Sequence, residues 1–492
     1  MIPDLDMLRC ALSPILTDGG TGNTVITSVE NNAARVRKGS LFCAVKGAKA
    51  DGHDFIPQAE ENGAAAYVVS ALWNGTPPAG KPVLRVKDPY YAWAILCEEA
   101  AGRPADDFRV HTVTGTNGKT TIAFVLRHLL KECGAKTGLL TTVLTDFGDG
   151  IPQEAAYTMP DAALLQQCFC AMKKNAITDA VMECSSHGLH QHRCGSLFFS
   201  SAIFTNLTGD HLDYHGTMEA YYQAKRLLFT EMLMPDAPCV INTDDAYGKR
   251  LYDELRTSGI PALDFSAQHN AFCHLTEFQP VDDGSVLHFE LDGKPYRIKS
   301  KLRGEYNAVN LLEAVTDAFA LDLPAEQVLS AAGSVTPAPG RLDPIRLKNG
   351  ATAFVDFAHT HDALAQVLPV LRKLLQPGGR LVTVFGCGGD RDRTKRPKMG
   401  AAAAKDSDIC YVTSDNPRSE DPEAIIKEIL AGIPEGQCVF AIADRAEAIR
   451  KAAAALREND ILLVAGKGHE TTQEIKGVKH PFRDMAILQE FA

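Results

Sequence analysis

Short apolar runs that alternate with helical stretches fill the last third of the chain. The runs are "AFVDFAH", "LVTVFGCGG", "ICYVTSDNP", "CVFAIADR" and "ILLVAGKG". Strands that alternate with helices predict a parallel, doubly wound α/β sheet. Ligands of such sheets gather beyond the carboxyl ends of the strands. Four residues fall at these ends and are candidate site positions: Asp356, Gly386, Asp415 and Gly466.

A glycine-rich stretch, "VTGTNGKTT" at residues 113–121, stands between an apolar run and a segment with apolar residues at helical spacing. This strand–loop–helix order predicts a phosphate site, because main-chain N–H groups and a helix N-terminus attract phosphate. Lys119 would meet the terminal phosphates, and Thr120 would hold magnesium. Val113 replaces a glycine of the usual pattern, which argues against standard kinases and motor ATPases. A glycine-rich turn with an exposed lysine is the alternative.

The chain of 492 residues is too long for one hydrophobic core. Polar runs with prolines, around Pro104 and before Gly340, interrupt the pattern of strands and helices. We therefore expect three α/β domains. They are a small N-terminal domain over residues 1–104, a central P-loop-type ATPase domain with a parallel sheet over 105–336, and a Rossmann-like doubly wound domain over 337–492.

Composition excludes several classes of partner. A formal net charge of -11 argues against binding to nucleic acid or to an anionic membrane. The N-terminus has early acidic residues and no secretory signal, and no stretch approaches the roughly 20 apolar residues of a membrane helix. The 13 cysteines are scattered and odd in number, which predicts reduced, mostly buried thiols in the cytoplasm.

Two further stretches place an acidic and an imidazole side chain where a cation could bind. Glu183 ends the apolar run before "CSSHGLHQHR", so we expect it at a strand end, where a carboxylate can complete a magnesium site. His211 lies in "TNLTGDHLDYHG", a loop before a helix capped by Thr217, and could bind a second cation. The alternatives are a solvated strand-end acid and a surface loop rich in His and Asp.

Lys225 lies on the apolar stripe of the next helix, four residues from both Tyr221 and Phe229. A lysine there either extends to the edge of the core or does chemistry. If it were buried beside magnesium, its pKa would fall. The neutral amine could then react with carbon dioxide to give a carbamate, an anion that suits magnesium.

Seven motifs occur together in the order and spacing of one enzyme family. They are "TGTNGKTT", "MECSSHGL", "TNLTGDHLDYHGTMEAYYQAKRLLF", "VDFAHTHDAL", "GCGGDRDRTKRPKMG", "SDNPRSEDP" and "AGKGHETTQ". The chain resembles the Mur ligases over nearly its whole length, and among them those that add diaminopimelate. The resemblance implies an ATP-dependent carbon–nitrogen ligase of peptidoglycan synthesis, and so of cell-wall biogenesis, cell shape and cell division, in the cytoplasm.

The resemblance also implies the reaction and its cofactors. ATP would phosphorylate the D-glutamyl γ-carboxylate of UDP-N-acetylmuramoyl-L-alanyl-D-glutamate, and the amine of meso-diaminopimelate would attack the acyl phosphate. One Mg²⁺ would bind Thr120 and Glu183, and a second would bind His211 and carbamylated Lys225. Glu183, His211, Lys225 and Lys119 would be catalytic. ATP would contact Gly115, Thr116, Asn117, Gly118, Lys119, Thr120, Thr121, Asn310, Arg341 and Asp356.

By the same resemblance, the UDP-sugar peptide would contact Ala33, Thr158, Met159, Ser185, Gln191 and Arg193. Diaminopimelate would contact Arg391, Asp415, Asn416, Pro417, Arg418, Gly466 and Glu470. "DNPR" marks diaminopimelate as against lysine, because an arginine can pair bidentately with the distal carboxylate that lysine lacks. Without the family, "SDNPRSEDP" predicts a turn that caps the helix at Pro422.

The chain departs from the family pattern at three places. Asn32-Ala33-Ala34 stands where Asp-Ser-Arg is usual, Met159 replaces the second threonine of a common pair, and His361 replaces a common proline. The first two changes concern the UDP-muramoyl end and leave the ATP and magnesium residues intact.

Other functions stay open at this point. A ligase that adds L-lysine, or one of folate polyglutamylation or cyanophycin synthesis, would keep the chemistry and change the substrate. A catalytically silent nucleotide-binding homologue would be expected to lack Lys119, Glu183, His211 or Lys225, and all four are present. A P-loop kinase would leave Lys225 and the C-terminal arginines without a role. We expect a monomer, as is usual in the family.

Overall fold

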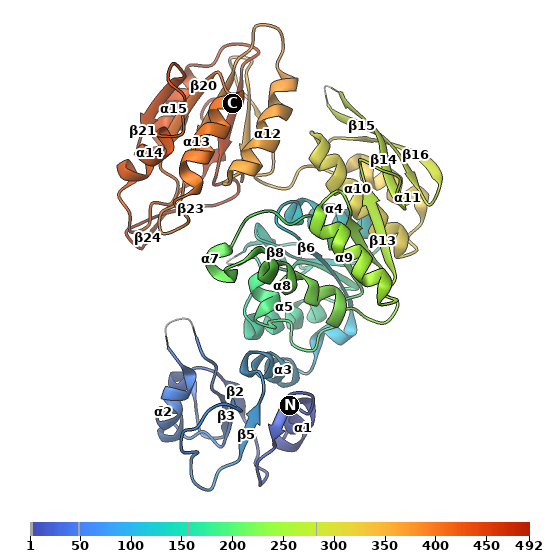
Figure 1. Ribbon diagram of the computed structural model, residues 1–492, viewed down its shortest axis with the longest axis vertical. Helices are drawn as coiled ribbons and strands as arrows, with labels where there is room; N and C mark the ends of the chain where they lie inside the picture. The colour runs from blue at the N-terminus through green and yellow to red at the C-terminus, as the bar shows by residue number, and fades with distance from the viewer. Residues whose placement is uncertain (1–2, 48–49, 156, 282) are drawn as a thin grey trace. The chain divides into compact units, whose positions relative to one another are not determined.

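The computed structural model describes residues 3–47, 50–155, 157–281 and 283–492 (Figure 1). The chain divides into two compact units. The first holds Met1–Lys119, Leu129–Asp264 and Asp317–Leu323, and the second holds Thr120–His128, Phe265–Thr316 and Pro324–Ala492. No helix of the described residues is both long and apolar enough to cross a bilayer. The domain boundaries expected near residues 104 and 336 stay predictions.

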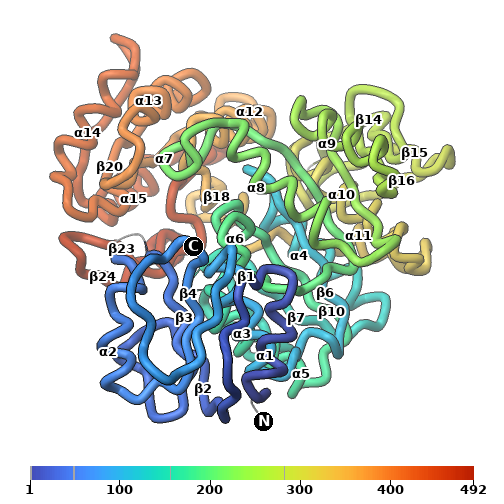
Figure 2. The backbone as a smooth tube through the Cα atoms, turned by 60° about the horizontal axis from the view of Figure 1, so that its bottom comes forward, coloured from blue at the N-terminus to red at the C-terminus, as the bar shows by residue number. Residues whose placement is uncertain are grey.

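A five-stranded sheet opens the first unit. Its order is β1-β5-β4-β3-β2, with β1 (Leu16–Asp18), β2 (Ser28–Glu30), β3 (Ser40–Cys43), β4 (Ala66–Ser70) and β5 (Val83–Val86). Alternate strand residues face opposite sides, so Leu41 and Val68 pack under α1 (Leu5–Ala11) and α3 (Pro89–Ala101), while Phe42 and Tyr67 pack under α2 (Ile56–Glu61). Figure 2 shows these helices on the two sides of the strands.

The central sheet of the first unit is parallel in its middle. Its order there is β12-β11-β6-β10-β7-β8-β9, with only the last two pairings antiparallel. The strands are β6 (Arg109–Thr114), β7 (Thr137–Leu140), β8 (Leu144–Asp146), β9 (Gln153–Glu154), β10 (Asp179–Glu183), β11 (Ser201–Phe204) and β12 (Cys239–Asn242). The helices between them are α4 (Lys119–Glu132), α5 (Ala162–Lys174), α6 (Ser186–His190), α7 (Leu212–His215), α8 (Met218–Glu231) and α9 (Ala246–Thr257).

A chain of buried polar side chains crosses this sheet. His111 on β6 lies 3.0 Å from an Asp179 oxygen through Nε2 and 2.9 Å from the Ser201 hydroxyl through Nδ1. The Ser201 hydroxyl lies 2.8 Å from a carboxylate oxygen of Asp317, which is fully buried on α10 (Glu305–Ala320). Burial raises the pKa of Asp317 to about 6, although His111 and the Ser201 hydrogen bond oppose the shift.

The C-terminal part of the second unit is the doubly wound sheet that the sequence predicts. Its order is β17-β18-β22-β19-β20-β21, parallel except for β17, with β17 (Asp343–Arg346), β18 (Thr352–Asp356), β19 (Leu381–Phe385), β20 (Ile409–Thr413), β21 (Cys438–Ile442) and β22 (Ile461–Ala465). One face packs under α12 (His361–Leu374), α13 (Lys395–Asp406) and α14 (Pro422–Leu430). The other packs under α15 (Arg445–Ala454) and α16 (Asp484–Gln489).

The second unit also contains an antiparallel ribbon of β14 (Cys273–Val281), β15 (Gly284–Leu291) and β16 (Lys294–Ser300), against which α11 (Ala325–Ser334) packs. The chain passes from one unit to the other within β13 (Ala262–Ser266). A hairpin of β23 (Thr472–Ile475) and β24 (Val478–Pro481) follows the last strand of the doubly wound sheet. All 13 cysteines are free and most are buried, as expected.

Candidate active site

The phosphate loop has the predicted strand–loop–helix form. Strand β6 ends at Thr114 and α4 begins at Lys119, so Thr120 and Thr121 lie in the first helical turn. Gly115 has φ of +152°, and a Cβ there would strike the hydroxyl of Thr205, so the residue must be small. The Lys119 ammonium donates to the main-chain oxygens of Gly115 and Thr116, at 2.8 Å each.

The residues after β11 fix the backbone of this loop. The Asn117 N–H donates to the side-chain oxygen of Asn206 at 2.9 Å, and the Thr205 hydroxyl donates to the Asn117 carbonyl at 2.6 Å. The Thr116 N–H donates to the carbonyl of Asn206 at 2.9 Å. The loop is therefore held in shape by an adjacent strand end, and sequence analysis did not assign Thr205 and Asn206 this role.

Lys225 is buried on α8 and does not extend to the surface. Its ammonium donates to the Gly115 carbonyl at 2.9 Å, lies 3.3 Å from the Thr114 hydroxyl, and stands 4.9 Å from the centre of the Tyr221 ring. The pKa of Lys225 is well below its ordinary value because burial removes water from the ammonium and because Lys119 is close. Burial therefore favours the neutral amine over the ammonium at this position.

Glu183 ends β10, as predicted, and its side chain is buried. The Thr142 N–H donates to one carboxylate oxygen at 3.0 Å, and the Thr142 hydroxyl lies 3.1 Å from the other. The same hydroxyl lies 3.0 Å from that of Thr158. Thr142 follows the end of β7, so the rule that places ligands at strand ends could have identified it.

Four imidazoles gather around α6 and α7, and we call them the histidine cluster: His187, His190, His211 and His215. The ring centroids of His187 and His211 are 4.9 Å apart, and His215 Nε2 lies 3.0 Å from the Ser186 hydroxyl. Desolvation and neighbouring cations lower the pKa of His211 to about 4, against the pull of Asp210. His211 is therefore neutral at pH 7, the form in which imidazole binds metals.

No group of three His, Cys, Asp or Glu side chains in the described ranges is arranged to hold a metal ion. Magnesium commonly binds through one or two carboxylates and the phosphates of its substrate.

The residues expected at the UDP-sugar peptide lie mainly around α6. Ser185 caps α6 by accepting the Gly188 N–H, and Gln191 ends the helix. The Arg193 guanidinium donates to the Gln191 side-chain oxygen, at 3.0 and 2.8 Å, and to the main-chain oxygen of Met159 at 2.8 Å. The Met159 side chain itself is buried in the core.

Ala33 lies apart in the N-terminal sheet's core, at the start of a short 3-10 turn that the Asn32 side chain caps. Its side chain is buried, and its carbonyl accepts from Asn62 at 2.9 Å. Neither Ala33 nor Met159 presents a polar side-chain group. Where the family uses Ser or Thr at these positions, this chain can offer a ligand only main-chain atoms.

The second unit contains the residues expected near adenine and ribose. Asp356 ends β18, and its oxygens accept from the N–H groups of Leu342 and Ala358 at 2.7 and 2.8 Å. Burial raises the pKa of Asp356, opposed by the nearby Arg341. Arg341 stacks on Phe357, 4.9 Å from the ring centre, and donates to the Thr120 hydroxyl at 3.2 Å. Asn310 is buried on α10.

The residues expected at diaminopimelate gather beyond β20 and β22. Asp415 is buried, and its Oδ2 atom has no hydrogen-bond partner among the described residues. A Cβ at Gly466 would lie 2.6 Å from this oxygen, so a side chain at position 466 would collide with it. Asn416 Nδ2 donates to Glu470 Oε2 at 2.9 Å. The structure thus brings two carboxylates together at the carboxyl end of the sheet.

Arg418 lies in the same loop after β20, between the glycine loop after β19 and the hairpin. Its Nη1 donates to the Gly389 carbonyl at 2.7 Å, and its Nε lies 3.5 Å from Glu474. Main-chain hydrogen bonds with Glu474 and Lys476 tie the residue to the hairpin. A Cβ at Gly388 would lie 3.0 Å from the Arg418 guanidinium and 3.8 Å from the Arg391 side chain, so both arginines border the same loop. Pro417 lies between Asn416 and Arg418 against the same glycine loop.

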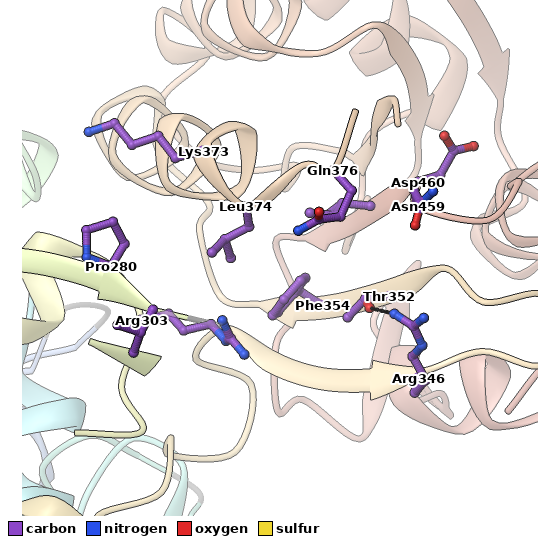
Figure 3. A pocket seen from close by; sticks show the side chains of 12 residues that line it. Pro280, Arg303, Arg346, Thr352, Phe354, Lys373, Leu374, Gln376, Asn459 and Asp460 are labelled. Atoms are coloured by element: carbon purple, nitrogen blue, oxygen red, sulfur yellow. Dashed lines mark hydrogen bonds between the residues drawn. The ribbon is translucent and has the colours of Figure 1, made fainter. Parts of the chain in front are cut away.

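The second unit also contains a hollow that lies away from the expected site residues. Figure 3 shows Phe354 between Arg303 and Arg346 in its wall. It also includes Thr352 and Ile461, which begin β18 and β22. It therefore lies at the amino ends of these strands, opposite the expected ligand end, and none of the expected site residues lines it.

Three regions of the chain match models of known protein families, one after another along the sequence. Residues 25–91 match the model of the Mur ligase family catalytic domain, residues 113–318 match the Mur ligase middle domain, and residues 340–468 match the Mur ligase glutamate ligase domain. A UDP-N-acetylmuramoyl-L-alanyl-D-glutamate--2,6-diaminopimelate ligase from Aquifex aeolicus (strain VF5) is 40% identical over 474 residues, which are 94% of this chain and 93% of the relative. This chain belongs to the Mur ligase family.

Two further members of the family are similar to this chain over nearly its full length. A relative of the same name from Bacteroides thetaiotaomicron is 39% identical and covers 99% of both chains. A solved structure of a UDP-N-acetylmuramoyl-L-alanyl-D-glutamate--2,6-diaminopimelate ligase is 31% identical, with a TM-score of 0.69, and covers 100% of this chain and 98% of its own. The expected family and three-domain α/β fold are confirmed for this Mur ligase.

Proposed function

We propose that this Mur ligase joins meso-diaminopimelate to UDP-N-acetylmuramoyl-L-alanyl-D-glutamate at the expense of ATP, in peptidoglycan precursor synthesis. The names of its full-length relatives support the reaction. The observation that supports the substrate choice is that a guanidinium, that of Arg418, and two carboxylates, those of Asp415 and Glu470, occur in the loops after β20 and β22, where Asn416 binds Glu470.

The distal end of diaminopimelate carries one carboxylate and one ammonium, whereas the distal end of lysine carries only the ammonium. Arg418 would pair with the carboxylate, since a guanidinium binds a carboxylate bidentately. Asp415 Oδ2 is buried without a hydrogen-bond partner in the described part of the chain, and it would accept from the ammonium together with Glu470. Lysine would leave the guanidinium uncompensated, which costs free energy.

The chemistry requires an activated acid, because an amine does not displace water from a carboxylate spontaneously. The D-glutamyl γ-carboxylate attacks the γ-phosphorus of ATP, ADP leaves, and an acyl phosphate forms. The diaminopimelate amine then attacks the acyl carbon, and phosphate leaves from the tetrahedral intermediate as the amine loses a proton. Lys119 and the loop N–H groups would position the phosphates and neutralise their charge, which supplies most of the catalysis in phosphoryl transfer.

The donor groups expected at magnesium suit this ion, which would neutralise phosphate charge when bound. Glu183 is a buried carboxylate oriented by Thr142, and it would hold one ion with the Thr120 hydroxyl. Neutral His211 and Lys225 would hold a second. The Lys225 amine would first add to carbon dioxide, form an N–C bond and release a proton, giving the carbamate anion.

Around the nucleotide-sugar end, Ser185, Gln191, Arg193 and Thr158 would contact the substrate with their side chains. Met159 and Ala33 would contribute main-chain atoms, since both side chains are buried. Asn310, Arg341 and Asp356 would contact the adenosine part of ATP.

A ligation assay tests the proposal. Purified protein is incubated with magnesium-ATP, UDP-N-acetylmuramoyl-L-alanyl-D-glutamate and either meso-diaminopimelate or L-lysine, and products are read by mass and by phosphate release. We expect a tripeptide product with diaminopimelate and little with lysine. Efficient use of lysine would refute the substrate choice, and no product with either amine would refute the reaction.

A further inference from the structure

We propose that Lys467 is a positioning residue that sets the ammonium subsite of the amino-acid pocket by holding Asn416 and Glu470 in one arrangement. The inference takes its substrate, diaminopimelate, from the proposed function, but the contacts of Lys467 do not depend on that proposal. Lys467 follows Gly466 at the end of β22, and its side chain is fully buried. Burial of an ammonium is costly unless its hydrogen bonds are satisfied, so its partners indicate its role.

Both partners of Lys467 are pocket residues. Its ammonium donates to Asn416 Oδ1 at 3.0 Å and to Glu470 Oε2 at 2.6 Å. The N–H of Glu474 donates to the same Asn416 oxygen at 3.0 Å. Two donors at Oδ1 therefore fix which way the Asn416 amide faces, and its NH2 group must point at Glu470, to which it donates at 2.9 Å.

This arrangement has a consequence for Glu470. Its Oε2 accepts from both Lys467 and Asn416, and the side chain is about one-third exposed. Both hydrogen bonds thus go to the same oxygen of a carboxylate that is in part open to solvent. Charge-assisted hydrogen bonds are strong enough to hold a carboxylate in a single orientation.

The charges around this group favour positioning over simple neutralisation. The fully buried Arg445 lies close enough to Asp415 and Glu470 to interact with both, but its hydrogen bonds go to Asp484 and to the carbonyls of Ala465 and Ser414. The guanidinium is therefore paired with Asp484, and it acts on Asp415 and Glu470 through its charge at a distance. What Lys467 adds is direct contact with Glu470 and Asn416.

The test compares two amino acids that differ only at the subsite. L-2-Aminopimelate keeps the reacting amine and the distal carboxylate of diaminopimelate but lacks the distal ammonium. In Lys467→Met we expect kcat/KM for diaminopimelate to fall about 10- to 100-fold, the loss typical of a charge-assisted hydrogen bond. We expect kcat/KM for 2-aminopimelate and KM for ATP to change little, so that discrimination between the two amino acids collapses.

Lys451→Met is the matched control, since Lys451 is an exposed lysine of α15 paired with Glu447. It should leave all these constants unchanged. Lys467→Gln keeps a donor in place and serves if the methionine variant does not fold; it should give an intermediate loss of discrimination. Equal losses with both amino acids, or unchanged discrimination in a folded variant, would overturn the positioning role. A gain in diaminopimelate use would overturn it as well, because it would mean that Lys467 acts through its charge alone.

A second readout needs no substrate. In a crystal structure of the Lys467→Met protein we expect the Glu470 carboxylate or the Asn416 amide to turn from its present position. Unchanged positions would overturn the inference. If the wild-type enzyme ligated neither amino acid, the proposed function would fail, while this structural comparison would still decide the role of Lys467.

Discussion

The side-chain nitrogen of Lys225 lies 2.9 Å from the main-chain oxygen of Gly115, so a buried lysine touches the phosphate loop at its first glycine. The ring of Tyr221 lies 4.9 Å from the same nitrogen, and the Tyr221 hydroxyl lies 3.2 Å from that of Thr116. One helix, α8, therefore contacts the loop through two side chains. A change in the charge of Lys225 would therefore alter the electrostatic energy of a phosphate bound in the loop.

Lys225→Ala should lower ligation at least 100-fold, since electrostatic groups at a phosphoryl-transfer centre contribute about this much. The pKa of Lys225 is lowered by burial and by Lys119, which favours the neutral amine from which a carbamate would form. Added formate or acetate should partly restore the activity of the variant, as measured by phosphate release. An absence of rescue, together with full wild-type activity in carbon dioxide-free buffer, would refute the carbamate.

Arg418→Lys should raise KM for diaminopimelate about 10- to 100-fold, because a single ammonium replaces a bidentate guanidinium. KM for ATP should stay the same. Arg393→Lys is the control, since Arg393 is an exposed arginine that pairs with Glu428. Steady-state kinetics with each substrate varied in turn give the answer. An equal effect on ATP would mean that Arg418 supports the fold and not the choice of amino acid.

Gly188→Ala should lower the unfolding midpoint, because the added Cβ would meet the buried side chain of Met159. Overpacking of this kind costs about 1–3 kcal/mol. Met159→Ala alone should also destabilise, through a cavity that costs about 2–5 kcal/mol. The double variant should lose less than the sum of the two, since the new methyl enters the space that methionine leaves. Strictly additive losses in thermal unfolding would contradict the contact.

Asp317→Asn should remove a pH dependence of stability. Burial raises the pKa of Asp317 from 3.8 to about 6, so the folded protein binds this proton more tightly than the unfolded chain. Binding of this proton stabilises the folded protein fully below about pH 4, and the stabilisation is lost as the pH rises through about 6. The difference of roughly two units between the folded and unfolded pKa corresponds to about 3 kcal/mol in the free energy of unfolding.

The asparagine variant carries no such charge, so its unfolding midpoint should rise relative to that of the wild type between pH 4 and pH 7. Asp322→Asn, at the more exposed end of the same segment, provides the control. Parallel pH profiles for Asp317→Asn and the wild type would show that Asp317 is not the titrating group.

The parts of the site that sequence analysis anticipated are those with a local signal. Glu183 and Asp356 end apolar runs, and both lie at strand ends as expected. The helical spacing of Lys225 with Tyr221 and Phe229 indicated an apolar stripe, and all three are buried on α8. In each case a strand or helix period of a few residues decides where the side chain points.

The parts that sequence analysis missed depend on contacts between distant segments. Thr142 orients Glu183 from a residue 41 positions away, and Lys467 reaches Asn416 across 51 positions. No period links such pairs, so only the folded sheet brings them together. The orientation of Met159 was missed for a related reason, since it lies in a loop where no repeat predicts which side faces the core.

The Lys119 ammonium already holds two acceptors, the carbonyls of Gly115 and Thr116. An incoming phosphate must therefore compete with the protein's own backbone for the same cation, and net affinity is the difference between the two arrangements. Neutral or weakly charged ligands would lose that competition, whereas a triphosphate would win it through its greater charge. A loop of this kind would favour a triphosphate over a bare nucleoside, because only the triphosphate carries enough negative charge to displace the two carbonyl contacts.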